Sequence, residues 1–106
     1  MTDVSIRVLL VEDIQIYIAL LRRLLESPTI ILHTANTLKE GLDQAETGKI
    51  DVILLDLGLP DCQGLDTFTT FKQNFPEIPV VILTGLDDED VAAKAVQERT
   101  GSRRIL

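Results

Sequence analysis

Three apolar runs of this chain each end in side chains that could handle a phosphoryl group. The first run leads into Glu12 and Asp13, the second into Asp56, and the third into Thr84. If the runs are parallel strands, their carboxyl ends meet in one crevice, where open α/β sheets hold their ligands. Three carboxylates and a hydroxyl gathered there would form an oxygen-rich cation site beside a possible nucleophile.

The three carboxylates predict a magnesium site. Acids held together without a cation repel one another, which raises carboxylate pKa values and destabilises the fold. Mg²⁺ resolves this repulsion because it accepts a few carboxylates together with waters and phosphate oxygens. Once the charge is neutralised, an aspartate can attack a phosphoryl group, and Thr84 could donate a hydrogen bond to a phosphoryl oxygen.

The elements that must position these side chains alternate between strand and helix. Near-continuous apolar runs, typical of strands buried on both faces, occupy residues 6–11, 29–34, 51–56 and 79–83. Apolar residues at helical spacing predict helices over residues 14–26, 37–48, 65–75 and 87–96. This strand–helix order predicts an α/β fold with a parallel sheet and right-handed crossovers.

Local signals define several of these boundaries. Thr37 can cap the second helix, and Glu40 three residues later would complete a capping box. Pro28 and Pro76 end the first and third helices. Turn residues cluster after Asp56, so residues 57–64 are expected to form a loop.

Composition limits the class of protein. A chain of 106 residues is one small domain, 1–106. The net charge of −7 argues against nucleic acid or an anionic membrane as a direct partner. The single cysteine, Cys62, cannot form an internal disulfide, and no apolar run approaches the ~20 residues of a membrane span. With no signal-like N-terminus, we expect a cytoplasmic protein.

On its motifs, the chain resembles the response-regulator receiver domains of two-component signalling. The resemblance rests on residues 8–13, on residues 51–61 with Gly64, and on residues 79–85, and it covers about 6–97. It implies a flavodoxin-like open parallel sheet that takes a phosphoryl group from a histidine kinase or a phosphotransfer protein.

The resemblance also assigns a role to each candidate residue. Asp56 would be the phosphoacceptor. Mg²⁺ would be held by Glu12, Asp13, Asp56 and the backbone carbonyl of Gly58. The hydroxyl of Thr84 would turn toward the phosphoryl group in the active state.

The end of the chain departs from the family pattern. Receiver domains continue into a fifth strand that ends in a lysine, and then into a fifth helix. Here residues 98–106 form an atypical tail, and the only lysine after Thr84 is Lys94. We expect most or all of the fifth strand and the fifth helix to be absent, although 101–106 could begin that strand. Arg103 and Arg104 precede the expected lysine position, so we do not expect either to replace it.

Two consequences follow from this departure. A missing fifth strand would leave the backbone groups of the fourth strand unpaired, and such an edge favours pairing with another chain. We therefore expect a homo-oligomer built on the exposed sheet edge. Mg²⁺ binding should survive because all the carboxylates remain, whereas phosphoryl transfer to Asp56 should be slow or absent.

Other functions were weighed against a phosphorylatable receiver. One alternative is a degenerate receiver that acts as a phosphorylation-independent dimerisation or protein-interaction module. Another is a small phosphohydrolase with an aspartyl nucleophile. Such enzymes carry a second aspartate two positions after the nucleophile as general acid, and here that position is Gly58. We therefore expect that the protein is not an enzyme.

Overall fold

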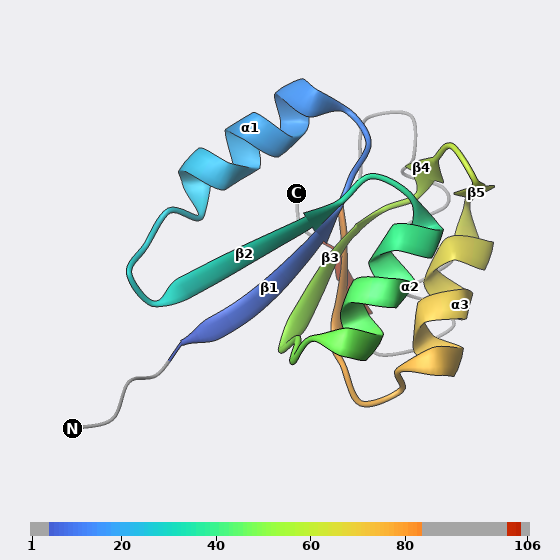
Figure 1. The fold of residues 1–106 in the computed structure, drawn as a ribbon. Coiled ribbons are helices and arrows are strands. Elements are labelled where there is room, and N and C mark those ends of the chain that lie inside the picture. Colours follow the sequence, from blue (N-terminus) through green and yellow to red (C-terminus); the bar gives the residue numbers. More distant parts are fainter. Residues whose placement is uncertain (1–4, 84–101, 105–106) are drawn as a thin grey trace.

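The computed structural model describes residues 5–83 and 102–104 (Figure 1). Its elements are β1 (Ile6–Val11), α1 (Gln15–Leu24), β2 (Ile30–Ala35), α2 (Leu38–Thr47), β3 (Val52–Asp56), β4 (Gly58–Leu59), β5 (Cys62–Gln63), α3 (Leu65–Asn74), β6 (Val80–Leu83) and β7 (Ser102–Arg104). The strands and helices predicted within these ranges are confirmed, with ends shifted by one or two residues. The helix predicted over 87–96 lies outside the described residues.

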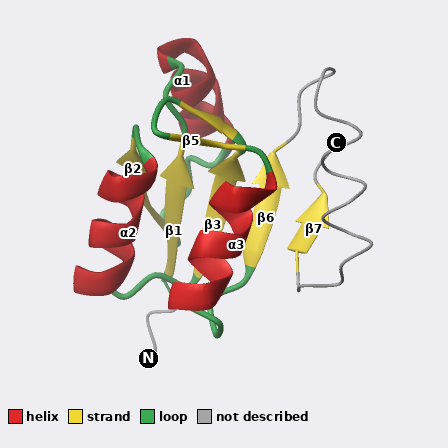
Figure 2. Cartoon of the chain, turned by 90° about the vertical axis from the view of Figure 1, so that its right-hand side faces the viewer, coloured by secondary structure: helices red, strands yellow, loops and turns green. Residues whose placement is uncertain are grey.

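The main sheet is parallel, with strand order β2-β1-β3-β6-β7. The chain moves outward from β1 to β2 and then crosses back to β3 on the other side of β1. The direction of winding therefore reverses between β1 and β3, and the crevice at such a reversal is where open α/β sheets bind ligands. Helix α1 covers one face of the sheet, while α2 and α3 cover the other (Figures 1 and 2). The predicted flavodoxin-like α/β fold is confirmed.

Both faces of the sheet are packed with apolar side chains. On the α2 and α3 face, Phe68 and Phe71 are buried among residues of β1, β3 and β6. Helix α2 approaches β1 closely at Gly41, where an added Cβ would lie 3.0 Å from the Phe71 ring and 3.1 Å from Val11. On the opposite face, Ile18 of α1 packs with residues of β1 and β3. These two layers hold the ends of β1 and β3 in place.

The edge of the sheet differs from the expectation. Strand β7 pairs in parallel with β6, with Ser102 opposite Val80 and Arg104 opposite Ile82. The prediction of an unpaired β6 edge is therefore wrong over these three residues, because the tail supplies partners for its backbone groups. Asp56 pairs with Leu83, so Arg104 lies one position short of the level of Asp56. This register agrees with the expectation that both arginines precede the lysine position.

Helix α1 carries apolar side chains on its solvent side. Ile16, Tyr17, Leu20 and Leu24 are 71%, 51%, 55% and 71% exposed. The helix contains no acid, and its last turn is basic. Among the helices in the described part of the chain, none combines the length and apolarity needed to cross a membrane.

Candidate functional site

The three predicted acids come together at the carboxyl ends of β1 and β3. The two strands are paired, with Val11 opposite Leu55, so the residues that follow them are neighbours. One carboxylate oxygen from each of Glu12, Asp13 and Asp56 lies within 4.8 Å of the others. This spacing allows all three to contact one small cation.

Glu12 is the most buried of the three acids, with an exposed fraction of 3%. Its backbone N–H donates to the carbonyl of Ala35 at 2.9 Å, which continues the β1–β2 pairing beyond β1. Burial raises the pKa of the Glu12 carboxyl from an ordinary 4.5 to about 7, and repulsion by Asp56 and Asp13 acts in the same direction. The backbone N–H of Ile14, 3.1 Å from Oε2, opposes this rise.

Asp13 provides the observation that points most directly to a cation. Its Oδ1 is buried and finds no hydrogen-bond partner among the residues that the structure describes. A buried oxygen without a donor is costly, so its presence calls for an explanation. A cation between the three carboxylates would supply the missing partner. Carboxylate oxygens are hard ligands that suit Mg²⁺, so the residues present fit that ion.

Asp56 ends β3 and is partly exposed, so its carboxylate is accessible from solvent. Gly58 follows two residues later, at the start of β4 and on the surface. A Cβ added to Gly58 would lie 3.7 Å from Oδ2 of Asp56, which places this backbone directly beside the carboxylate. The role of the Gly58 carbonyl as a metal ligand stays a prediction.

The loop after Asp56 is a small hairpin. Gly58 pairs with Gln63 and Leu59 with Cys62 in an antiparallel ladder. The hairpin closes with a 2.7 Å hydrogen bond from the N–H of Gly64 to the carbonyl of Leu57. Gly64 has φ of +72°, a conformation that favours glycine. The predicted turn-rich loop is thus confirmed, but its two short strands were not expected.

Asp61 in this hairpin makes contacts that the sequence analysis missed. Its Oδ1 accepts from the backbone N–H of Leu38 at 2.8 Å, and its Oδ2 accepts from that of Lys39 at 3.1 Å. These bonds, led by that of Leu38, lower the pKa of the Asp61 carboxyl. An acid can stabilise a helix N-terminus, but only the folded chain shows which helix Asp61 reaches.

Two predicted features of the site cannot be placed. Thr84, the predicted switch hydroxyl, lies outside the described residues. The same is true of Lys94, the only lysine after it. The described part of β7 contains no lysine.

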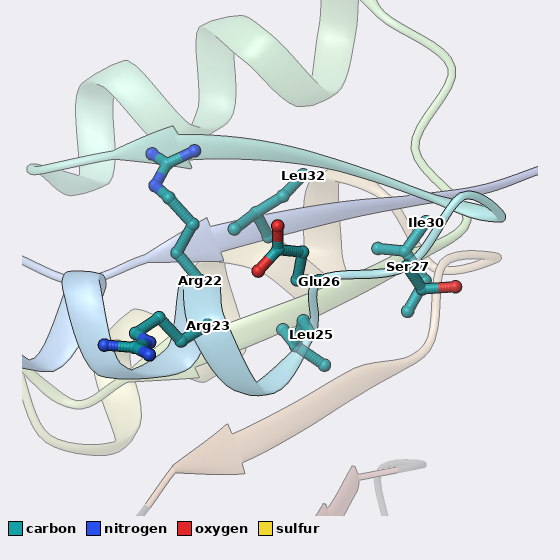
Figure 3. A pocket seen from close by; sticks show the side chains of 7 residues that line it. All are labelled: Arg22, Arg23, Leu25, Glu26, Ser27, Ile30 and Leu32. Atoms are coloured by element: carbon teal, nitrogen blue, oxygen red, sulfur yellow. The ribbon is translucent and has the colours of Figure 1, made fainter.

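A pocket of about 330 Å³ lies elsewhere, between the end of α1 and the start of β2 (Figure 3). Arg22, Arg23 and Glu26 lie around it together with apolar residues, among them Leu25 and Ile30. Because β2 begins here, the pocket is at the amino end of the sheet, opposite the acids. It is therefore separate from the candidate site.

Comparison with known proteins identifies the family. The family model of the response regulator receiver domain matches residues 8–102. The chain belongs to this family. It is therefore a receiver domain of two-component signalling, as the motifs at Glu12, Asp13 and Asp56 predict.

Individual relatives agree with this assignment. The KDP operon transcriptional regulatory protein KdpE of Escherichia coli is 40% identical over 82 residues, which make up 77% of this chain and 36% of KdpE. The cell cycle transcriptional regulator CtrA of Caulobacter vibrioides is 34% identical over 88 residues, 83% of this chain and 38% of CtrA. The match thus spans little more than a third of the length of these curated relatives.

Solved receiver structures share the fold. The signal receiver domain of an HD domain-containing protein from Pseudomonas fluorescens Pf-5 superposes with a TM-score of 0.85 at 25% identity. The match covers 99% of this receiver domain and 76% of that chain. The parallel sheet and its flanking helices are thus those of a receiver domain.

Proposed function

We propose that this receiver domain accepts a phosphoryl group on Asp56, in the presence of Mg²⁺, from a histidine kinase or a phosphotransfer protein. The observation that carries the proposal is the meeting of Glu12, Asp13 and Asp56 within 4.8 Å, with a buried Asp13 oxygen that no described residue satisfies. In this role the domain is a substrate of phosphotransfer and not itself an enzyme.

The chain's own residues divide the work. A carboxylate oxygen of Asp56 attacks the phosphorus of a phosphohistidine, a P–O bond forms, the P–N bond breaks, and the leaving imidazole takes a proton. Glu12 and Asp13, with Asp56 and the Gly58 carbonyl, would hold Mg²⁺, and bound Mg²⁺ supplies charge neutralisation between the two anions. Glu12 must release its proton to serve as a ligand. We further propose that the Thr84 hydroxyl donates to a phosphoryl oxygen.

Reaction with acetyl phosphate or beryllofluoride tests this function without a kinase. The folded protein is incubated with and without Mg²⁺, and modification is read by intact mass or NMR. Modification that requires Mg²⁺ supports the proposal. A folded protein that binds Mg²⁺ but is never modified would instead support the phosphorylation-independent interaction module.

We propose that the kinase or phosphotransfer protein docks on α1. The helix begins two residues after Asp13, so its first turns lie beside the acids. Its exposed side chains Ile16, Leu20 and Leu24 recur every four residues and form one apolar stripe. An apolar stripe next to the phosphoacceptor suits a partner that must bring its phosphohistidine to Asp56.

Leu20→Glu is expected to slow phosphotransfer from an autophosphorylated histidine kinase by about tenfold, because a charge would enter an apolar contact. Reaction with acetyl phosphate should stay unchanged, since the acids are untouched. Ile31→Glu, at an apolar side chain of β2 that is 37% exposed, is the matched control. Equal transfer rates in the two variants would exclude α1 as the docking surface.

Self-association through the sheet edge also remains our proposal, although β7 now covers part of β6. The outer strands of the described sheet are β2 and β7, and β7 is only three residues long. Short outer strands still present backbone groups to a second copy. Sedimentation velocity at micromolar concentrations is expected to show a dimer, and a single monomeric species would refute the proposal.

A further inference from the structure

The N-terminus of α2 is capped from two directions. The first N–H groups of a helix have no partner within the helix. The hydroxyl of Thr37 accepts from the N–H of Glu40 at 3.0 Å, which is the predicted local cap. The two N–H groups before it donate to the carboxylate of Asp61, at 2.8 and 3.1 Å. The cap of α2 is therefore complete only when the hairpin after β3 is in place.

The same hairpin carries Gly58, the predicted carbonyl ligand of the metal. Strands β4 and β5 have two residues each, and a hairpin this small is not stable by itself. Leu59 holds it to the core, because that side chain is completely buried. Asp61 is the second attachment described, and it links the hairpin to a helix that is distant in the sequence.

The start of α2 is in turn attached to the other side of the site. Just before the helix, the side-chain amide of Asn36 donates to the backbone carbonyl of Glu12 at 3.4 Å. The backbone N–H of Asn36 donates to Oε1 of Glu40 at 2.6 Å, so the predicted box closes on Asn36 and not on Thr37. Contacts thus run without interruption from Asp61 through the first turn of α2 to Glu12.

We infer that Asp61 is a positioning residue of the metal site. Its carboxylate holds the Gly58 backbone at a set distance from Glu12 and Asp13 by linking the hairpin to the first turn of α2. The positive end of the α2 dipole stabilises the negative charge of Asp61, so this exposed acid keeps its place. The inference rests on the proposed function, because it concerns the geometry of the same Mg²⁺ site.

The test compares Asp61→Ala with Thr37→Ala. Both variants remove hydrogen bonds from the same helix end and should destabilise the protein to urea, but only Asp61→Ala releases the hairpin. We expect Asp61→Ala to weaken Mg²⁺ binding by about tenfold, as loss of a ligand's supporting contact commonly does. Thr37→Ala should bind Mg²⁺ nearly as tightly as the wild type. Binding is measured by NMR titration with Mg²⁺ alone.

Two further variants separate other causes. Asp66→Ala removes an exposed charge from the first turn of α3, so an unchanged Mg²⁺ affinity there would exclude a mere loss of negative charge. Asp61→Asn keeps one acceptor oxygen and should fall between wild type and alanine, which also covers the case in which Asp61→Ala does not fold.

The outcomes distinguish this inference from the proposed function. If wild type binds Mg²⁺ and the Asp61 variants bind it equally well, the positioning role is refuted and the proposed function stands. Equal weakening in Asp61→Ala and Thr37→Ala would also refute it, since capping alone would then explain the effect. If wild type does not bind Mg²⁺, both the inference and the proposed function fail.

Discussion

Asp56→Asn is expected to abolish the Mg²⁺-dependent modification of this receiver domain by acetyl phosphate. An amide lacks the nucleophilic oxygen of a carboxylate, so the acyl phosphate cannot form. The substitution keeps the shape of the side chain at the end of β3, and the fold should therefore be retained. Intact mass spectrometry after incubation with acetyl phosphate and Mg²⁺ would show the added phosphoryl group in wild type alone.

Asp66→Asn is the matched control for this experiment. Asp66 is an exposed aspartate in the first turn of α3 and is not one of the three clustered acids. Its variant should be modified to the same extent as the wild type. Continued modification of Asp56→Asn would mean that another side chain is the acceptor, and peptide mapping would identify it.

The second large effect is a dependence of stability on pH that originates at Glu12. Its pKa is about 7 in the folded protein and near 4.5 in the unfolded chain. Between these values the unfolded chain has released its proton while the folded protein still holds it. The free energy of unfolding of the metal-free protein therefore falls as pH rises through this window, by on the order of 3 kcal/mol. Below pH 4.5 Glu12 contributes no penalty, and above 7 the penalty is complete.

Urea unfolding of wild type and Glu12→Gln would isolate this contribution. The difference between their free energies of unfolding is compared at pH 4, 6 and 8 in the presence of a chelator. We expect wild type to lose stability relative to Glu12→Gln as pH rises, because glutamine does not titrate. A difference that is constant across this range would show that Glu12 is not an acid with a raised pKa.

Added Mg²⁺ should reverse the loss in wild type. The ion binds the ionised carboxylates of the folded state, so at a hundredfold excess over its Kd it would add about 2.7 kcal/mol at pH 8. The stabilisation should shrink at pH 5, where a proton occupies Glu12. Glu12→Gln, which keeps Asp13 and Asp56, should gain less from the ion at pH 8.

Much of the candidate site follows from local sequence patterns. Apolar runs mark β1 and β3 as buried parallel strands, and parallel strands bring their carboxyl ends to one edge of the sheet. Glu12, Asp13 and Asp56 were therefore predicted to meet, and the structure brings them together. Helix boundaries and the Thr37 cap could likewise be predicted, because periodicity and capping depend on residues a few positions apart.

The tertiary structure determined features that depend on contacts distant in the sequence. The pairing of Ser102–Arg104 with β6 was left open by the sequence, because a three-residue strand has too little apolar pattern to define its register. The bonds from Leu38 and Lys39 to Asp61 span 23 and 22 residues, so the turn chemistry around Asp61 could not reveal them.

The chemical state of the site also depended on the fold. The sequence by itself determined which acids meet, since strand order and residue type are enough to place them at one edge. Only the tertiary structure decided that Glu12 is buried, with its pKa near 7, and that an oxygen of Asp13 lacks a described partner. The physical reason is that residue type and periodicity are local properties, whereas desolvation and hydrogen bonding depend on the neighbours that the whole fold supplies.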